Sequence, residues 1–104
     1  MPLRTNQNGF DSEIMVSGRV DGRLANELEI SILAAMRAGA QTIAINMAEA
    51  TFLCSAAIRV FLQYARTMKS AGKRLFVSNP SAEVNEGLQI TGFAEMILEK
   101  GQRA

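Results

Sequence analysis

Residues 43–57 read IAINMAEATFLCSAA, and this stretch decides both the fold and the candidate site. It opens as a short apolar run, passes through small and polar residues, and meets an apolar pattern of helical spacing from Ile58. We interpret it as a buried strand over 42–47, a loop over 48–54, and the start of a helix with Ser55 as its N-cap. A serine hydroxyl placed there lies at the partial positive end of a helix, which favours a phosphate.

Upstream of this stretch, the sequence predicts two strands and a helix. An Asn-Gly pair is a turn signal between a strand over 3–7 and a second strand from about residue 13, which ends in a break over 18–22. Apolar residues then recur at three- and four-residue spacing over 24–38, with Asp21 as the candidate N-cap. This helix connects the second strand to the buried strand.

Downstream, the same kinds of signal predict two further helices and two further strands. An apolar stripe continues the helix of Ser55 over 55–71, and a strand follows over 74–78. Ser81 is a candidate N-cap for a short helix that ends at Gly92. A last short strand or edge segment is expected over 95–98.

Alternating strands and helices imply a mostly parallel sheet with right-handed crossovers, and the opening hairpin adds an antiparallel edge. We therefore predict an α/β fold in one domain over 1–104, with a core of about 10–98. It should contain a mostly parallel four- to five-stranded sheet, an antiparallel N-terminal edge and three or more helices. The loop before Ser55 leaves its strand at the carboxyl end, where α/β sheets form their sites.

Composition excludes several classes of protein. The 104 residues are enough for one domain, and 11 basic against 10 acidic residues give no reason to expect nucleic acid or an anionic membrane as partner. A single cysteine excludes an internal disulfide framework and favours a reducing compartment. The first residues lack an apolar signal-peptide region, and no apolar run approaches a membrane span, so we expect a cytoplasmic protein without membrane insertion.

Missing residue types also argue against catalysis. The chain has no histidine, so a zinc site is not expected, and a Ser-His-Asp or Cys-His nucleophile cannot form within it. It has neither a P-loop nor a G-x-G-x-x-G motif. Only Cys54 and isolated carboxylates remain as catalytic candidates. We expect no metal, no cofactor and no enzymatic activity.

Three landmarks together resemble the STAS domain, the family of bacterial anti-sigma factor antagonists. Gly18-Arg19-Val20-Asp21 is similar to the family's G-x-L-D. IAINMAEATFLCSAA is similar to its buried strand, its D-L-S and its F-I-D-S-S/A-G loop. SAGKRLFVSNPS, over 70–81, is similar to its helix, glycine, strand and polar turn. The likeness covers about residues 10–98.

The resemblance implies a regulatory binding protein that works by partner switching. Such a protein binds a kinase-like ATPase, the anti-sigma factor, and phosphorylation of one loop serine ends the binding. On this chain that serine is Ser55, with Thr51 as the alternative acceptor. The partner-binding residues expected from the resemblance are Asp21, Arg23, Thr51, Phe52, Cys54, Ser55, Ala56, Ala57 and Arg59.

The chain departs from the family pattern at the site itself. Cys54 replaces the aspartate before the serine, Ala57 replaces the following glycine, and Asn-Met-Ala over 46–48 replaces D-L-S. An alternative function therefore fits the sequence: a STAS-type accessory subunit that binds a transporter or signalling complex constitutively, without phosphorylation.

Several residues of the candidate site each have two possible interpretations. Ser55 can be a plain helix cap, a phosphate acceptor or both. Cys54 can be a thiolate activated by the helix end or a small side chain that fills the place of the aspartate. Asp21 and Arg23 can contact a partner, or can respectively cap a helix and face solvent. Met47 can fill the core, or can be exposed with Phe52 on the loop and help to hold a partner.

Overall fold

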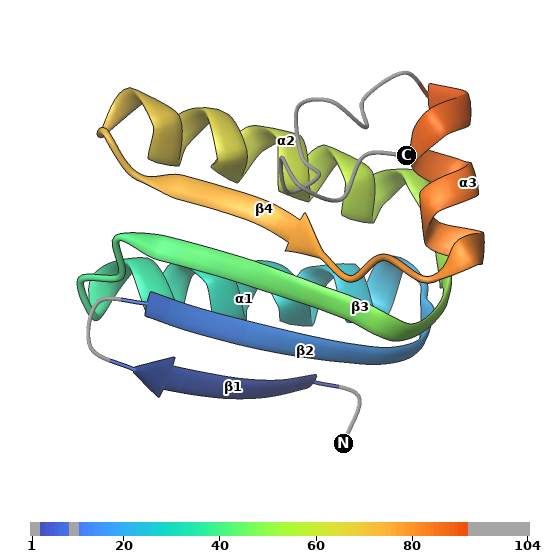
Figure 1. Ribbon diagram of the computed structural model, residues 1–104, viewed down its shortest axis with the longest axis horizontal. Helices are drawn as coiled ribbons and strands as arrows, with labels where there is room; N and C mark the ends of the chain where they lie inside the picture. The colour runs from blue at the N-terminus through green and yellow to red at the C-terminus, as the bar shows by residue number, and fades with distance from the viewer. Residues whose placement is uncertain (1–2, 9–10, 92–104) are drawn as a thin grey trace.

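The computed structural model describes residues 3–8 and 11–91 (Figure 1). In chain order the elements are β1 (Leu3–Asn8), β2 (Asp11–Val20), α1 (Gly22–Arg37), β3 (Thr42–Leu53), α2 (Ser55–Ser70), β4 (Arg74–Ser78) and α3 (Ala82–Thr91). This confirms the predicted order of strands and helices up to the last helix. The strand expected over 95–98 and the glycine expected to end that helix, Gly92, lie outside the described residues.

The described strands form one four-stranded sheet in the order β1-β2-β3-β4. β1 pairs with β2 in antiparallel fashion, whereas β2 with β3 and β3 with β4 are parallel. Parallel neighbours require a crossover, and α1 and α2 provide the two crossovers. The predicted α/β class, with a mostly parallel sheet and an antiparallel N-terminal edge, is confirmed.

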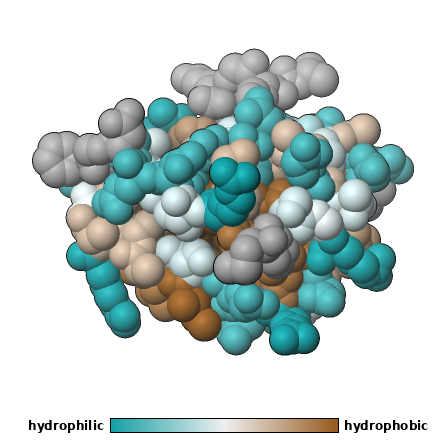
Figure 2. All heavy atoms as spheres, turned by 90° about the horizontal axis from the view of Figure 1, so that it is seen from below, coloured by the Kyte–Doolittle hydropathy of each residue, from teal (hydrophilic) through white to brown (hydrophobic). Residues whose placement is uncertain are grey.

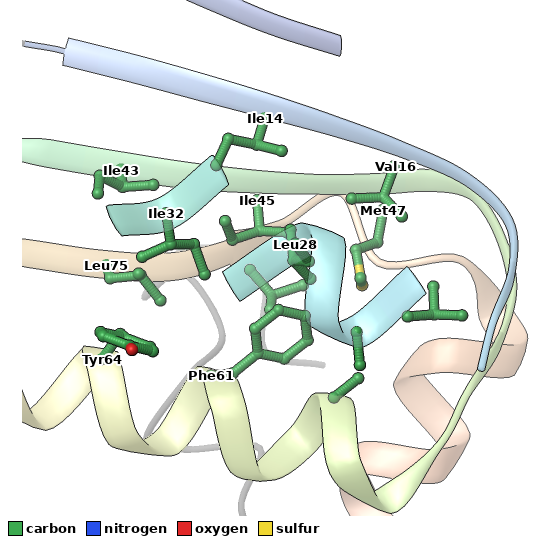
Figure 3. Packing of buried hydrophobic residues seen from close by; sticks show 14 of the residues in the cluster. Ile14, Val16, Leu28, Ile32, Ile43, Ile45, Met47, Phe61, Tyr64 and Leu75 are labelled. Carbon is green, nitrogen blue, oxygen red and sulfur yellow. The ribbon is translucent and has the colours of Figure 1, made fainter. Parts of the chain in front are cut away.

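The core lies between one face of the sheet and two helices. Ile14 is opposite Ile45, which is opposite Val77, and all three side chains are fully buried. Figure 3 shows side chains of α1 and α2 directed toward these strands. In the view of Figure 2, strongly hydrophobic residues occupy a few small areas between hydrophilic ones. The helical side chains that fill the core include Leu28, Ile32, Phe61 and Met68.

β3 is longer than predicted. The prediction of a loop over 48–54 is wrong, because all of these residues except Cys54 belong to the strand. The strand continues to Leu53, which still pairs with Val20 of β2. Two register shifts give β3 extra residues relative to β2. The shifts break the alternation, so that Met47 and then Ala50 are the buried positions. Over the second half of β3, buried and exposed residues therefore do not alternate, so the sequence lacks the two-residue period by which a strand is predicted.

Glycines follow the ends of α1 and α2, as the sequence predicted for both helices. Gly39 and Gly72 have φ values of 90° and 75°, which glycine adopts without strain. After Gly72, the backbone N–H of Lys73 donates to the carbonyl oxygen of Met68 at 2.8 Å. This bond satisfies a carbonyl at the end of α2 and turns the chain directly into β4.

Tyr64 joins α1 and α2 at the edge of the core. Its hydroxyl donates a hydrogen bond to Oε2 of Glu29 at 2.6 Å, and only 7% of the residue is exposed. The hydrogen bond to Glu29 raises the pKa of Tyr64, and burial and the carboxylate charge raise it further. The folded protein therefore holds the phenolic proton more tightly than the unfolded chain does.

This shift predicts a loss of stability at high pH that Tyr64→Phe should remove. Below the pKa of the unfolded chain, about 10, the contribution of Tyr64 is fully present. As the pH rises beyond it, the free energy of unfolding should fall until the folded-state phenol has also lost its proton. Tyr64→Phe should cost about 1 kcal/mol at neutral pH and show a shallower decline in alkali.

Urea unfolding of both proteins at about pH 7 and about pH 11 tests this prediction. Because Tyr64 is the only tyrosine, the absorbance of its phenolate can also be titrated directly in native and urea-unfolded protein. Equal titration midpoints in the two states would contradict the raised pKa.

Candidate functional site

Three helices begin at the same end of the sheet. The parallel strands β2, β3 and β4 all run toward this end, at the right in Figure 1, and α1, α2 and α3 follow them. Binding sites of α/β sheets form beyond the carboxyl ends of parallel strands. The junction of β3 and α2, where the sequence placed the candidate site, lies at this end.

The end of β2 lies directly beside the end of β3. Val20 is opposite Leu53 in the parallel register. The backbone N–H of Cys54 donates to the carbonyl oxygen of Val20 at 3.0 Å. Asp21, the residue after Val20, is therefore next to the start of α2.

Asp21 is the N-cap of α1, as predicted. Its Oδ1 accepts a hydrogen bond from the backbone N–H of Leu24 at 3.0 Å. The carboxylate also offsets the partial positive charge of the helix start. Asp21 and the nearby Arg23 are both exposed, so capping leaves both side chains at the surface.

Ser55 is the first residue of α2 and not its N-cap, which corrects the prediction. Cys54 occupies the cap position, and no side-chain hydrogen bond caps the helix. A thiol is a weak acceptor, and a residue already inside the helix does not fill the N-cap role. The carbonyl oxygen of Cys54 instead accepts the N–H groups of Ala57 and Ile58 at 3.1 and 3.2 Å. The exposed Ser55 hydroxyl takes no part in capping.

The surroundings of Ser55 favour negative charge. The first turn of α2 has no acidic residue. Arg59 is exposed and follows Ser55 by one helical turn, a spacing at which side chains are neighbours on the helix surface. The helix start and this guanidinium both stabilise an anion in their vicinity.

A bulge of β3 exposes two consecutive residues close to Ser55. The register passes from Gly18 opposite Ala50 to Arg19 opposite Phe52, so Thr51 is the extra residue. Thr51 and Phe52 are both exposed, Phe52 by 38%. Because a bulge redirects the side chains around it, both predicted contact residues face outward at the end of the sheet.

Arg19 is a residue of this surface that the sequence did not single out. The carbon of its guanidinium group lies 4.0 Å from the centroid of the Phe52 ring. Such a cation–π contact holds an arginine in place at the surface. Its only signal in the sequence was its position inside the G-x-L-D-like motif, and this motif does not indicate a contact with the ring of Phe52.

The remaining predicted contact residues divide between surface and core. Ala56 is exposed, whereas Ala57 is fully buried, so Ala57 cannot present its side chain to a partner and that prediction is corrected. Its methyl group lies on the side of α2 that faces the sheet. Cys54 is half-buried and packs against the core, which agrees with its interpretation as a filling side chain.

A hollow of about 480 Å³ opens between the end of β2 and the first turns of α1. It brings together Arg19, Asp21 and Arg23 but does not include Ser55. Its charged side chains are of both signs, because Glu27 also contributes. The candidate site thus extends from the start of α2 across Phe52 and Arg19 into this hollow.

The chemistry of this surface suits recognition of another protein. Across residues 3–8 and 11–91, no group of three His, Cys, Asp or Glu side chains is placed to hold a metal ion. In the same part of the chain, no helix has the length and apolar character needed to span a membrane. The surface offers hydroxyls, one aromatic ring and arginines, which are groups that protein interfaces use.

Ser81 fixes the bulged part of β3 against α3. Its hydroxyl donates to the carbonyl oxygen of Ala50 at 2.6 Å and accepts the N–H of Val84 at 3.2 Å, so its predicted N-cap role is confirmed. The backbone N–H of Ser81 also donates to the carbonyl oxygen of Met47 at 3.2 Å. These bonds hold the stretch of β3 that leads to Phe52.

Ser81→Ala is expected to lower the free energy of unfolding by about 1–2 kcal/mol, because α3 loses its cap and a strand carbonyl loses a donor. Urea denaturation measures the change. Ser70→Ala, which removes an exposed hydroxyl from the end of α2, is the matched control and should change stability by less than about 0.5 kcal/mol. Equal losses in the two variants would refute the proposed role of the Ser81 hydrogen bonds.

Comparison with known proteins adds a family and a fold. A family model described as the STAS domain matches residues 3–103. No curated protein matches the sequence. The anti-sigma factor antagonist SpoIIAA in its unphosphorylated form is a similar solved structure, with a TM-score of 0.80 and 21% identity, over 92% of this chain and 85% of that chain. The Bacillus cell fate determinant SpoIIAA in the phosphorylated form gives a TM-score of 0.73 and 20% identity, over 92% and 88% of the two chains.

Proposed function

The chain belongs to the STAS domain family, whose model matches residues 3–103, and from this premise we propose that it is an anti-sigma factor antagonist. In this role it binds a kinase-like anti-sigma factor through the surface around Ser55. Phosphorylation of Ser55 by that partner ends the binding, so that the two proteins form a switch. The role is recognition and not catalysis.

The observation that supports this proposal is the exposed hydroxyl at the first position of α2. Because Cys54 holds the cap position, the Ser55 hydroxyl is not held by a capping bond. A kinase needs an accessible hydroxyl that can turn toward its nucleotide, and Ser55 meets that need. The start of α2 also tolerates the negative charge of the product.

The same charge has the opposite effect across an interface. A phosphate adds about 1.5–2 negative charges at neutral pH. Inside the free domain, the helix start and the exposed Arg59 offset this charge. Under a bound partner the phosphate would lose water without gaining a matched cation, which costs several kcal/mol. A local modification can therefore end the binding without changing the fold.

Cys54 favours a second candidate function. It replaces the usual acid of the family, and the first turn of α2 has no other acid, so a kinase that recognises an acidic loop meets a changed surface. In this alternative the chain is an accessory subunit of a transporter or signalling complex. It binds constitutively, and Ser55 remains unmodified.

Affinity capture from the native lysate distinguishes the two functions. Mass spectrometry then identifies the captured partner proteins and locates any phosphate on this chain. Trypsin releases Thr51 and Ser55 together in the peptide 38–59, so fragment ions must assign the phosphate. A kinase-like ATPase in the bound fraction, with phosphate on Ser55 only in unbound protein, supports the switch. A transporter or scaffold complex with unmodified Ser55 supports constitutive binding.

A further inference from the structure

Phe52 is one of two large hydrophobic residues that are exposed in the described part of the chain. The other is Ile30 on α1, which is 61% exposed. Phe52 differs because it lies at the carboxyl end of β3, three residues before Ser55, and is stacked against a charged side chain. Aromatic and arginine side chains in this arrangement are the residue types that dominate binding energy at protein interfaces.

The contact between Arg19 and Phe52 leaves donors of the guanidinium group available. The central carbon of the group lies over the Phe52 ring, 4.0 Å from its centroid. A guanidinium group has five N–H donors around its edge, and one ring cannot occupy all of them. Among residues 3–8 and 11–91, no carboxylate pairs with these donors.

The charged groups around Arg19 are of both signs, because Glu27 lines the same hollow, but the helix starts favour an acidic partner group. Asp21, the acid nearest in sequence to Arg19, has one carboxylate oxygen bonded to the start of α1. The start of α2 has no acid in its first turn and has Arg59 in its second. A guanidinium that no carboxylate of the described residues pairs with can bind a carboxylate of a partner by two parallel hydrogen bonds.

We infer that Arg19 and Phe52 form an anchor for an acidic segment of the partner protein, in which an Asp or Glu side chain is adjacent to an apolar one. The carboxylate pairs with the edge of Arg19, and the apolar side chain covers the rest of the Phe52 ring. This inference rests on the proposed function and specifies the chemistry of its partner. It assigns to Arg19 a role that no motif indicates.

The anchor also connects phosphorylation to release. A phosphate on Ser55 places negative charge at the same end of the sheet as Arg19. It repels an incoming carboxylate and competes for the arginines of this surface. Release then follows from a loss of charge complementarity, in addition to the desolvation of the phosphate.

Photo-crosslinking in the native host tests the inference. Phe52→p-benzoylphenylalanine keeps an aromatic ring under Arg19, and the same replacement at Ile30 is the control for an exposed apolar site elsewhere. The full-length chain with the probe at position 52 should crosslink to a partner segment that contains Asp or Glu, and the chain with the probe at position 30 should not. A segment without a carboxylate, or no crosslink from position 52, would overturn the inference.

Charge reversal supplies the second arm of the test. Arg19→Glu in the position-52 probe chain should lower the crosslink yield about tenfold or more, and added salt should lower it as well. Arg74→Glu is the matched control, because Arg74 also lies over a ring, that of Phe76 at 4.8 Å, but at the start of β4. Arg19→Lys keeps the charge without the planar fork and should give an intermediate loss. Equal yields for Arg19→Glu and Arg74→Glu would refute the anchor.

Ser55→Glu in the probe chain separates the inference from the proposed function. A crosslink that survives Ser55→Glu but is lost with Arg19→Glu supports the anchor and contradicts the phosphorylation switch. The reverse result supports the switch and contradicts the anchor. Circular dichroism of each variant confirms that the chain remains folded.

Discussion

Ser55→Glu is expected to weaken binding to the kinase-like partner by about thirtyfold or more. An unpaired charge in an interface costs about 2–5 kcal/mol, which corresponds to this loss or a larger one. Within the free domain the new carboxylate lies at the start of α2, where it stabilises the helix by about 0.3–1 kcal/mol. The variant should therefore be at least as stable as the original chain while it binds poorly. Calorimetric titration and urea unfolding measure the two quantities separately.

Three control variants make this result specific. Ser55→Ala should keep both affinity and stability, within about 0.5 kcal/mol, because the Ser55 hydroxyl is not a helix cap. Gln63→Glu adds the same charge to an exposed position two turns further along α2 and should leave binding intact. Thr51→Glu tests the alternative acceptor. A loss of affinity in Gln63→Glu as large as in Ser55→Glu would show a general effect of charge and exclude a local switch.

The parts of the fold that the sequence predicted correctly depend on local physics. The helical spacing of Leu28 and Ile32 predicted the buried side of α1, because that period follows from the helix itself. The caps Asp21 and Ser81 were identified correctly, since each bonds a backbone N–H within its own first turn. Such features need no knowledge of distant parts of the chain.

The second half of β3 could not be predicted because it depends on a neighbouring strand. Its bulges arise from the register with β2, and they remove the alternation that marks a strand. The position of the cap at α2 has a similar cause. Serine is the better capping residue, but the hydrogen bond from Cys54 to Val20 extends the pairing with β2 as far as Cys54, and the helix starts immediately after it. Tertiary pairing thus displaced the boundary by one residue.

The candidate site shows the same division. Its expected place at the end of the parallel strands followed from the order of elements, and the structure has the junction of β3 and α2 at that end. The contact between Arg19 and Phe52 spans two strands at a bulge and left no trace in either segment. The burial of Ala57 was accessible to sequence reasoning, because it lies one helical turn before the buried Phe61. The family pattern marks Ala57 only by its place after the serine and carries no information on the side of the helix that it occupies.

Phe61→Ala is expected to have the largest effect on stability, a loss of about 3–5 kcal/mol in the free energy of unfolding. Phe61 is fully buried and extends from α2 into the layer between the helices and the sheet (Figure 3). Its removal deletes apolar contacts and leaves a cavity that elements fixed by hydrogen bonds cannot close. A domain of this size has about 5–15 kcal/mol of stability in total, so the melting temperature should fall by more than about 10 °C.

Phe76→Ala is the matched control, because Phe76 is only partly buried and alternates with the core residues Leu75 and Val77 along β4. It should cost about 1–2 kcal/mol less than Phe61→Ala, since part of the ring is already in contact with water. Phe61→Leu should keep most of the stability, with a loss of about 1–1.5 kcal/mol, because most of the side-chain volume remains. Because Phe61 does not reach the surface, folded Phe61→Leu should bind the partner with unchanged affinity. Equal losses for Phe61→Ala and Phe76→Ala would mean that the layer between α2 and the sheet is not the main source of stability.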